Sequence, residues 1–263
     1  MKMVRFEFTG SQTVCVLMGY IEGFETAHLL PLKERMYSLL SPFHFTSVMS
    51  LRELMVNTGT VISGSFALAI LHPQQFDPND IDFYVLPLGF GAVLKYVAQH
   101  GYIIDPYEHG TSKYVRQHIV VVRLIHPISQ KSINVITGFK DHVVEIITQF
   151  HSTLVMNYLA WFGLVVLYPE WTLNKAGLIV TDTLTSEQCF TKYIGRGYTL
   201  HRDVHTLTHP LEVHRCGEDP YCAATMRSLH DEHSYVEQFD DGEFDFKEAE
   251  EDMSWTLSIP CSF

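Results

Sequence analysis

Residues 61–85 read VISGSFALAILHPQQFDPNDIDFYV, and this stretch decides the fold. VISG predicts a short strand, SFALAILH a short helix that ends near Pro73, and IDFYVLP a second strand. Because side chains alternate across a strand, Asp80 and Asp82 should point to the same face, about 7 Å apart along the chain. Two carboxylates this close repel each other unless a cation lies between them, and oxygen ligands of this kind suit Mg²⁺.

Gly64 and Ser65 lie at the turn between the first strand and the helix. A glycine at this turn would let the backbone approach a ligand closely. The amides at the start of the helix, together with the Ser65 hydroxyl, would form a site for an anion. Phosphate at this turn and Mg²⁺ at the two aspartates would together describe a metal-bound nucleoside triphosphate.

The order of strand, Gly-Ser, short helix, loop and Asp-Ile-Asp resembles that of the nucleotidyltransferase superfamily, which includes DNA polymerase β, poly(A) polymerases and the minimal nucleotidyltransferases. The resemblance covers roughly residues 58–137. It implies that Gly64 and Ser65 bind the triphosphate and that Asp80 and Asp82 hold two Mg²⁺ (or Mn²⁺) ions. The implied activity is transfer of a nucleoside monophosphate to an acceptor hydroxyl on RNA, a nucleotide, a small molecule or a protein. More distantly, the runs INVI, FHSTLVMN, LYPEWT and CFTKYIGRGY, within residues 133–198, resemble uncharacterised fungal proteins with this core.

The sequence departs from the family pattern at the third carboxylate, which a later strand should carry. That strand reads SINVITG, and its central residue is Asn134. Asn offers a carbonyl oxygen, but it cannot act as a base and it binds Mg²⁺ more weakly than a carboxylate does. Two interpretations stay open. Either catalysis runs with two aspartates and help from elsewhere, such as Asp141 or the substrate, or the domain is a catalytically impaired nucleotide-binding or protein-interaction module.

The remaining pattern predicts an α+β fold. Residues 32–57 should form helical pieces broken at Pro42, FGAVLKYVAQHG a helix that ends at Gly101, and YIID an edge strand. KYVRQHIVVVRLIHP and KSINVITG should be neighbouring antiparallel strands. DHVVEIITQF, STLVMNYLAWFGLVVLYP, TLNKAGLIV and SEQCFTKYIGRG all favour helix.

Three regions are therefore expected. Residues 1–140 would form a small mixed β-sheet of the nucleotidyltransferase type, with helices before it. Residues 141–229 would form a helical domain that makes the other wall of the cleft, and residues 230–263 an acidic, solvated tail. Lys175, Lys192 and Arg196 are basic residues that could reach triphosphate oxygens from the helical half, and Lys192 is the candidate phosphate ligand. Phe190 and Tyr193 recur at helical spacing, which is typical of a core.

A cluster near the C-terminus holds His214, Cys216, Cys222 and His230. Sulfur and imidazole ligands suit a structural Zn²⁺ ion, although five residues between the cysteines exceed the usual two to four. Free thiols and a disulfide between Cys216 and Cys222 are the alternatives, and a reducing compartment disfavours the disulfide.

Composition limits the class of protein and of partner. A hydrophobic fraction of 46% supports a folded core, and a formal net charge of −12 argues against duplex DNA as a partner. The sequence lacks a long apolar run and the apolar start of a signal peptide. We therefore expect a cytoplasmic or nuclear protein with no membrane association.

Overall fold

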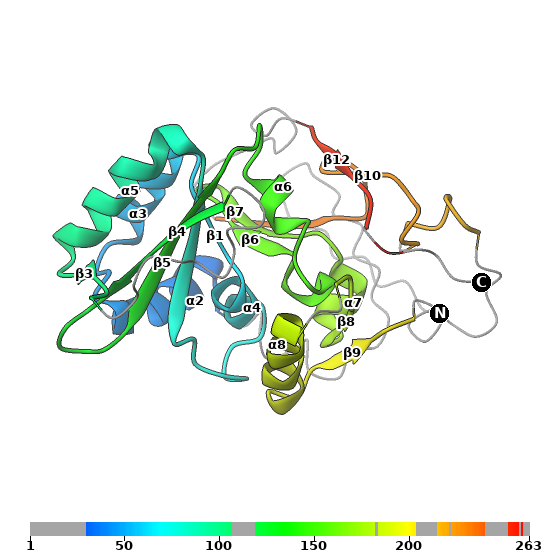
Figure 1. The fold of residues 1–263 in the computed structure, drawn as a ribbon, viewed down its shortest axis with the longest axis horizontal. Helices are drawn as coiled ribbons and strands as arrows, with labels where there is room; N and C mark the ends of the chain where they lie inside the picture. The colour runs from blue at the N-terminus through cyan, green and yellow to red at the C-terminus, as the bar shows by residue number, and fades with distance from the viewer. Residues whose placement is uncertain are drawn as a thin grey trace.

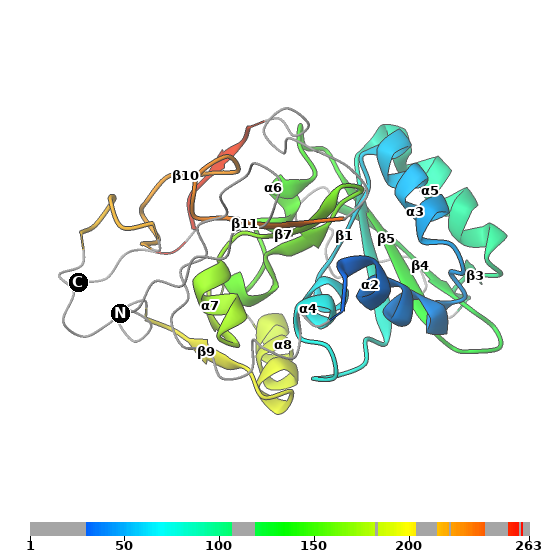
Figure 2. The same ribbon diagram turned by 180° about the vertical axis from the view of Figure 1, so that it is seen from behind.

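The computed structural model describes most of the chain. The described residues are 30–106, 119–181, 184–203, 215–220, 222–239, 252–257 and 259. They form a mixed α/β structure built on one large sheet, with helices on both of its faces (Figures 1 and 2).

The main sheet has eight strands in the order β11-β7-β6-β1-β2-β5-β4-β3 among the described residues. β2 and β5 are parallel, and every other neighbouring pair is antiparallel. The strands are β1 (Val61–Ser63), β2 (Asp80–Val85), β3 (Ile103–Ile104), β4 (Ile119–Ile125), β5 (Ser132–Gly138), β6 (Asn157–Leu159), β7 (Gly163–Val166) and β11 (Tyr235–Gln238). The expected antiparallel pairing of the two β-rich runs, and the edge position of β3, are confirmed.

Helices from the first half of the chain cover one face of this sheet. They are α2 (Leu32–Leu40), η1 (Ser41–Phe43), α3 (Val48–Thr58), α4 (Ser65–Leu71) and α5 (Pro87–Gln99). The break at Pro42 is confirmed, since the α2 helix gives way there to the 3₁₀ turn η1. The Ser47 hydroxyl caps α3 by accepting from the Ser50 amide at 3.1 Å. Both views show α3 and α5 side by side over the β4–β5 end of the sheet (Figures 1 and 2).

Alternation along β2 divides its side chains between the two faces. Ile81, Phe83 and Val85 are buried under the helices of the first half. Asp80, Asp82 and Tyr84 point to the opposite face, and Tyr84 packs there with hydrophobic residues of the second half of the chain. The sequence prediction that the two aspartates share a face is therefore confirmed.

The prediction of a helical domain over residues 141–229 is wrong. STLVMNYLAWFGLVVLYP forms the short 3₁₀ turn η3 (Thr153–Val155) and then the hairpin β6–β7, which extends the main sheet beside β1. Both faces of this hairpin are buried, so its apolar residues run continuously and lose the period of two that marks a half-exposed strand. TLNKAGLIV forms only the end of a helix and then a strand.

Two longer helical predictions in this region have different outcomes. DHVVEIITQF contains only the short α6 (Val144–Ile147). SEQCFTKYIG, by contrast, lies in α8 (Leu184–Gly195) as expected. Gly197 follows α8 with φ +84°, in the left-handed conformation that ends helices. The remaining elements here are α7 (Pro169–Leu173) and the parallel pair of β8 (Ala176–Leu178) and β9 (Thr199–His201).

The prediction of a solvated tail over residues 230–263 is also wrong for its described part. β11 pairs with β7 at the edge of the main sheet, and β12 (Ser254–Trp255) pairs with β10 (Arg227–Ser228). Phe239 and Trp255 are among the few apolar residues of this acidic segment, and they are buried in the two core clusters. Because acidic residues dominate the composition of the segment, these apolar residues did not indicate a packed structure. Residues 240–251 lie outside the described part of the chain.

A buried ion pair joins α2 to β11, two elements that lie far apart in the sequence. The Arg35 guanidinium, on α2, pairs with the Glu237 carboxylate on β11 and donates to the Ile70 carbonyl oxygen at 2.7 Å. The Arg35 side chain is only 1% exposed, so Glu237 compensates a charge that is removed from water. In the described part of the chain, helices are all too short or too polar to span a bilayer.

Candidate functional site

Four strands align a row of polar residues on the face that carries the aspartates. The register places Ser63 of β1 beside Asp82 of β2, Asp82 beside Asn134 of β5, and Asn134 beside Arg123 of β4. Paired residues on neighbouring strands point to the same side, about 5 Å apart. The row therefore runs from a hydroxyl through a carboxylate and an amide to a guanidinium.

The two oxygens of the Asp82 carboxylate have different surroundings. Oδ1 accepts a hydrogen bond of 2.7 Å from Nδ2 of Asn134. Oδ2 lies against the β1–α4 turn, so closely that a Cβ at Gly64 would lie 2.8 Å from it. Gly64 also has φ +69°, which disfavours any side chain at this position. From the sequence we expected the backbone at Gly64 to approach a ligand. In the structure, the atom that lies nearest to where a Cβ at Gly64 would lie is Oδ2 of Asp82.

Asp80 and Ser65 complete this side of the site. The Ser65 hydroxyl donates to Oδ1 of Asp80 across 3.5 Å, the upper limit for a hydrogen bond. Ser65 is buried, while Asp80 and Asp82 remain partly exposed. No Lys, Arg or His of the described residues forms an ion pair with either aspartate. The structure thus brings Gly64, Ser65, Asp80, Asp82 and Asn134 together.

The electrostatics of the pair follow from this geometry. The pKa of Asp82 is raised to about 7, chiefly by burial and secondly by the nearby negative charge of Asp80. The hydrogen bond from Asn134 and the positive charges of Lys192 and Arg123 oppose this shift. At neutral pH the carboxylate is therefore poised between its two protonation states, and an added cation would favour the ionised one.

Helix α8 supplies positive charge close to the aspartates. Lys192 lies near enough to lower the pKa of Asp82, and its side chain is exposed, without an ion-pair partner among the described residues. Tyr193, the next residue, is buried in the core as the helical spacing predicts. α8 lies beside α4 in both views (Figures 1 and 2). Lys192 is therefore an exposed cation near the aspartates, with its Nζ 5.5 Å from the centroid of the Tyr193 ring.

The two other basic candidates are engaged elsewhere. Nζ of Lys175 donates to Oε1 of Gln75 at 2.8 Å. The Arg196 guanidinium stacks on the ring of Phe76, 3.8 Å from its centroid. These contacts fasten α8 and β8 to the loop between α4 and β2. In the described structure these two residues therefore help to hold α8 and β8 against the loop between α4 and β2.

His151 and Arg123 lie near the site, although the sequence analysis did not assign either residue to a nucleotide site. The His151 ring packs against Phe190 and Tyr193 of α8, and burial, with the charge of Lys192, lowers the pKa of His151 to about 4. His151 is therefore neutral at pH 7. Arg123 faces Asn134 and contacts Asp105 at 3.4 Å. The signal that could have found Arg123 is the register of the β4–β5 hairpin, which places Arg123 beside Asn134.

The candidate zinc ligands are only partly gathered. The sulfur atoms of Cys216 and Cys222 lie 3.9 Å apart, and neither cysteine forms a disulfide. Nδ1 of His230 lies 3.9 Å from the Asp252 carboxylate, and His214 falls outside the described residues. Within the described ranges no three His, Cys, Asp or Glu side chains form a group that could hold a metal ion. A structural Zn²⁺ stays a prediction.

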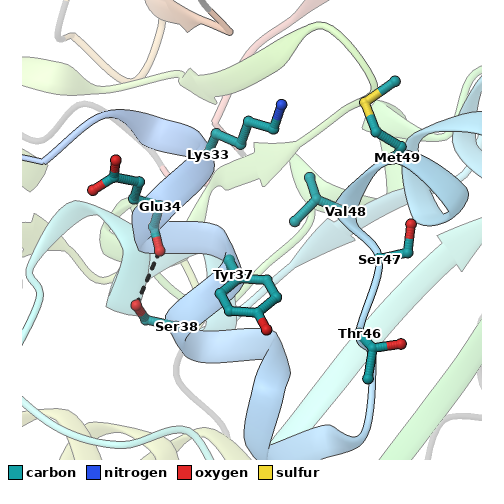
Figure 3. A pocket seen from close by; sticks show the side chains of 8 residues that line it. All are labelled: Lys33, Glu34, Tyr37, Ser38, Thr46, Ser47, Val48 and Met49. Atoms are coloured by element: carbon teal, nitrogen blue, oxygen red, sulfur yellow. Dashed lines mark hydrogen bonds between the residues drawn. The ribbon is translucent and has the colours of Figure 1, made fainter.

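A separate hollow of about 660 Å³ lies between α2 and the start of α3 (Figure 3). Its wall includes Lys33, Glu34, Tyr37 and Met49, and Ser38 donates there to the Glu34 carbonyl oxygen at 3.0 Å. These helices cover the face of the sheet opposite to the aspartates. The hollow is therefore unrelated to the polar row.

The donor set of Asp80, Asp82 and Ser65 fits a hard divalent cation. Two carboxylates and a hydroxyl supply oxygen atoms of the kind that Mg²⁺ and Mn²⁺ prefer. The amide of Asn134, by contrast, turns its Nδ2 hydrogen atoms, and not its oxygen, toward Asp82. Comparisons of the chain with protein-family models, with curated proteins and with solved structures found no significant match.

Proposed function

We propose that this chain is a Mg²⁺-dependent nucleotidyltransferase, which transfers a nucleoside monophosphate from a nucleoside triphosphate to an acceptor hydroxyl. The observation that carries the proposal is the close approach of the Gly64 turn to two carboxylates on one face of the sheet. Neither carboxylate is neutralised by an ion pair within the described structure, so the pair is suited to an external cation.

The finer fold belongs to the same proposal. β1, α4, β2 and β5 would form the nucleotidyltransferase core, with the Gly-Ser turn after the first strand and the aspartates on the second. The antiparallel pairing of β1 with β2 and the parallel pairing of β2 with β5 are consistent with it. β4 would complete this core as the antiparallel neighbour of β5.

Each residue has a role that its position supports. Asp80 and Asp82 would hold Mg²⁺, which, when bound, stabilises negative charge on the phosphates and lowers the pKa of the attacking hydroxyl. Gly64 keeps the turn next to Asp82 free of a side chain, and Ser65 orients Asp80 through its hydroxyl. Lys192 is exposed and free of an ion pair with the described carboxylates, so it would bind a triphosphate oxygen.

A second candidate function is nucleotide binding without transfer. The hydrogen bond from Asn134 to Asp82 favours it, because a neutral amide stands where a third carboxylate would otherwise supply a base and a cation ligand. The two candidates share the same binding site and differ only in turnover.

Incubation with each α-labelled nucleoside triphosphate and Mg²⁺ tests the proposal. Cell RNA, free nucleotides and cell protein would be offered as acceptors, and both pyrophosphate release and labelled product would be measured. Transfer should be lost in Asp80→Asn and Asp82→Asn. Asp77→Asn is the matched control, since Asp77 is exposed in the loop before β2.

The outcomes separate the two candidates. Labelled product that depends on both aspartates and not on Asp77 supports the transferase. Mg²⁺-dependent binding of the triphosphate without product, under all acceptors, supports the nucleotide-binding module. If the wild-type chain binds no triphosphate, or if the Asp82→Asn variant binds and reacts as well as the wild type, both candidates are wrong.

A further inference from the structure

We infer that the polar row holds one divalent cation rather than two, on the side of Asp82 that faces Gly64 and Asp80, and that Asn134 excludes the second. This inference rests on the proposed function, because it concerns the cation that would accompany the nucleotide. Three features of the described structure carry it: the partners of the Asp82 oxygens, the charge beyond Asn134 and the number of carboxylates.

The first feature is the asymmetry of the Asp82 carboxylate. Oδ1 is engaged by the Asn134 amide at 2.7 Å, and Oδ2 is directed to the β1–α4 turn. An amide N–H is a donor, so a cation next to Nδ2 would meet hydrogen atoms that carry partial positive charge. The oxygen free for a cation is therefore Oδ2, on the side of Asp80 and Ser65.

The second feature is the sign of the charge along the row. Beyond Asn134 the register places Arg123 on the same face of the sheet. Asp105 lies 3.4 Å from the Arg123 guanidinium, but this residue belongs to the segment after β3, on the far side of the row from Asp82. A second cation between Asp82 and Arg123 would thus face a guanidinium and an amide donor instead of an anion.

The third feature is the number of available ligands. Two divalent cations that act together lie about 3.5–4 Å apart and need shared carboxylate oxygens. Mg²⁺ needs octahedral geometry, with one or two carboxylates supplemented by phosphates and water. Asp80 and Asp82 with a triphosphate suffice for one such cation. For a second, the described residues of the row offer no further carboxylate. They offer the hydroxyl of Ser63, which already donates to the Asn157 carbonyl oxygen at 2.6 Å, and the amide oxygen of Asn134, a weaker ligand than a carboxylate.

Counting bound Mn²⁺ tests the inference. The full chain is titrated with Mn²⁺, alone and with saturating amounts of an ATP analogue that cannot be cleaved between the α- and β-phosphates. Electron paramagnetic resonance reports free Mn²⁺ and shows magnetic coupling when two ions lie close together. We expect one tightly bound Mn²⁺ per wild-type chain and no coupling signal.

Two variants of Asn134 provide the comparison. Asn134→Asp adds a carboxylate at the same place and removes the amide donor, so it should raise the number to two and produce the coupling signal. Asn134→Leu has a similar size, removes the amide and adds no carboxylate, so it should keep the number at one. Urea denaturation shows whether each variant is folded. The number of Mn²⁺ ions bound per wild-type chain tests the inference even if a variant fails to fold.

The outcomes also separate the inference from the proposed function. Two coupled Mn²⁺ ions in the wild-type chain, or a single ion in a folded Asn134→Asp variant, would overturn the inference and leave the proposed function standing. If the wild-type chain binds no Mn²⁺ with or without the nucleotide analogue, both are overturned.

Discussion

Replacing Asp82 by Asn should make the folded protein more stable in the absence of divalent cations, and increasingly so as the pH rises. The folded-state pKa of Asp82 is about 7, above its ordinary value of 3.8, chiefly because of burial and then the charge of Asp80. Between pH 5 and pH 7 the unfolded chain has therefore released this proton while the folded chain still holds it. The wild-type protein consequently loses stability as the pH rises through this window.

The size of the effect follows from the width of the window. One proton held by the folded state changes the free energy of unfolding by about 1.4 kcal/mol per pH unit. Over about two pH units the stability of the wild type should fall by roughly 2–3 kcal/mol relative to Asp82→Asn. The variant has no such charge to bury, and its side-chain oxygen can still accept the hydrogen bond from Asn134.

Urea denaturation at pH 5, 6, 7 and 8 in the presence of a chelator measures this difference. Asp77→Asn is the control, because the same chemical change in an exposed loop should give a difference that does not vary with pH. A difference between wild type and Asp82→Asn that stays constant from pH 5 to pH 8 would refute the reasoning. It would mean that the folded site accommodates the charge without a penalty.

Two further substitutions test the turn and the buried ion pair. Gly64→Ala should destabilise the fold by about 1–3 kcal/mol and weaken Mn²⁺ binding at least about tenfold, because its Cβ would displace the Asp82 carboxylate; Gly91→Ala, in open space on α5, should change neither by as much. Glu237→Ala should cost about 3 kcal/mol in urea denaturation, since it leaves the Arg35 charge buried and unpaired. Glu232→Ala is its control, because Glu232 is exposed. Equal free energies of unfolding for the two variants would show that Glu237 does not stabilise the buried Arg35.

The first half of the fold could be predicted because its local signals agree with one another. Proline and glycine mark element ends at Pro42, Gly64 and Gly101. The buried residues of α3 and α5 recur every three or four positions, as expected for a helix with one buried face. The shared face of Asp80 and Asp82 follows from strand alternation alone. These features depend on neighbours in the sequence, which is why the sequence was sufficient.

The second half could not be predicted because its strands are covered on both faces. Residues 156–168 are buried except for the partly exposed Trp161, and Asn157 is itself buried. No alternation of polar and apolar residues therefore reveals the period of the strands, and a buried helix would have looked the same. Gly163 was the available signal: a Cβ there would collide with the backbone of β11, which is a reason for glycine in a strand. The pairing partner, however, comes from about 70 residues later in the chain.

The site was predictable in its residues but not in its contacts. The pattern indicated Gly64, Asp80 and Asp82, and a resemblance indicated Asn134. The hydrogen bond from Asn134 to Asp82 depends on the register of two parallel strands, whose connection is too long for turn chemistry to fix. The approach of Lys192 depends on how α8 packs, and nothing local determines that.

The ion pair between Arg35 and Glu237 has a consequence for how the chain folds during synthesis. Its partners are separated by 202 positions, and β11 closes the sheet on the side where β7 would otherwise be an edge. A ribosome-bound chain that ends before β11 would carry an uncompensated guanidinium inside a partly formed core and an open strand edge exposed to other chains. We therefore expect the native state to form only after residue 238 has left the ribosome, and a nascent chain to depend on chaperones until then.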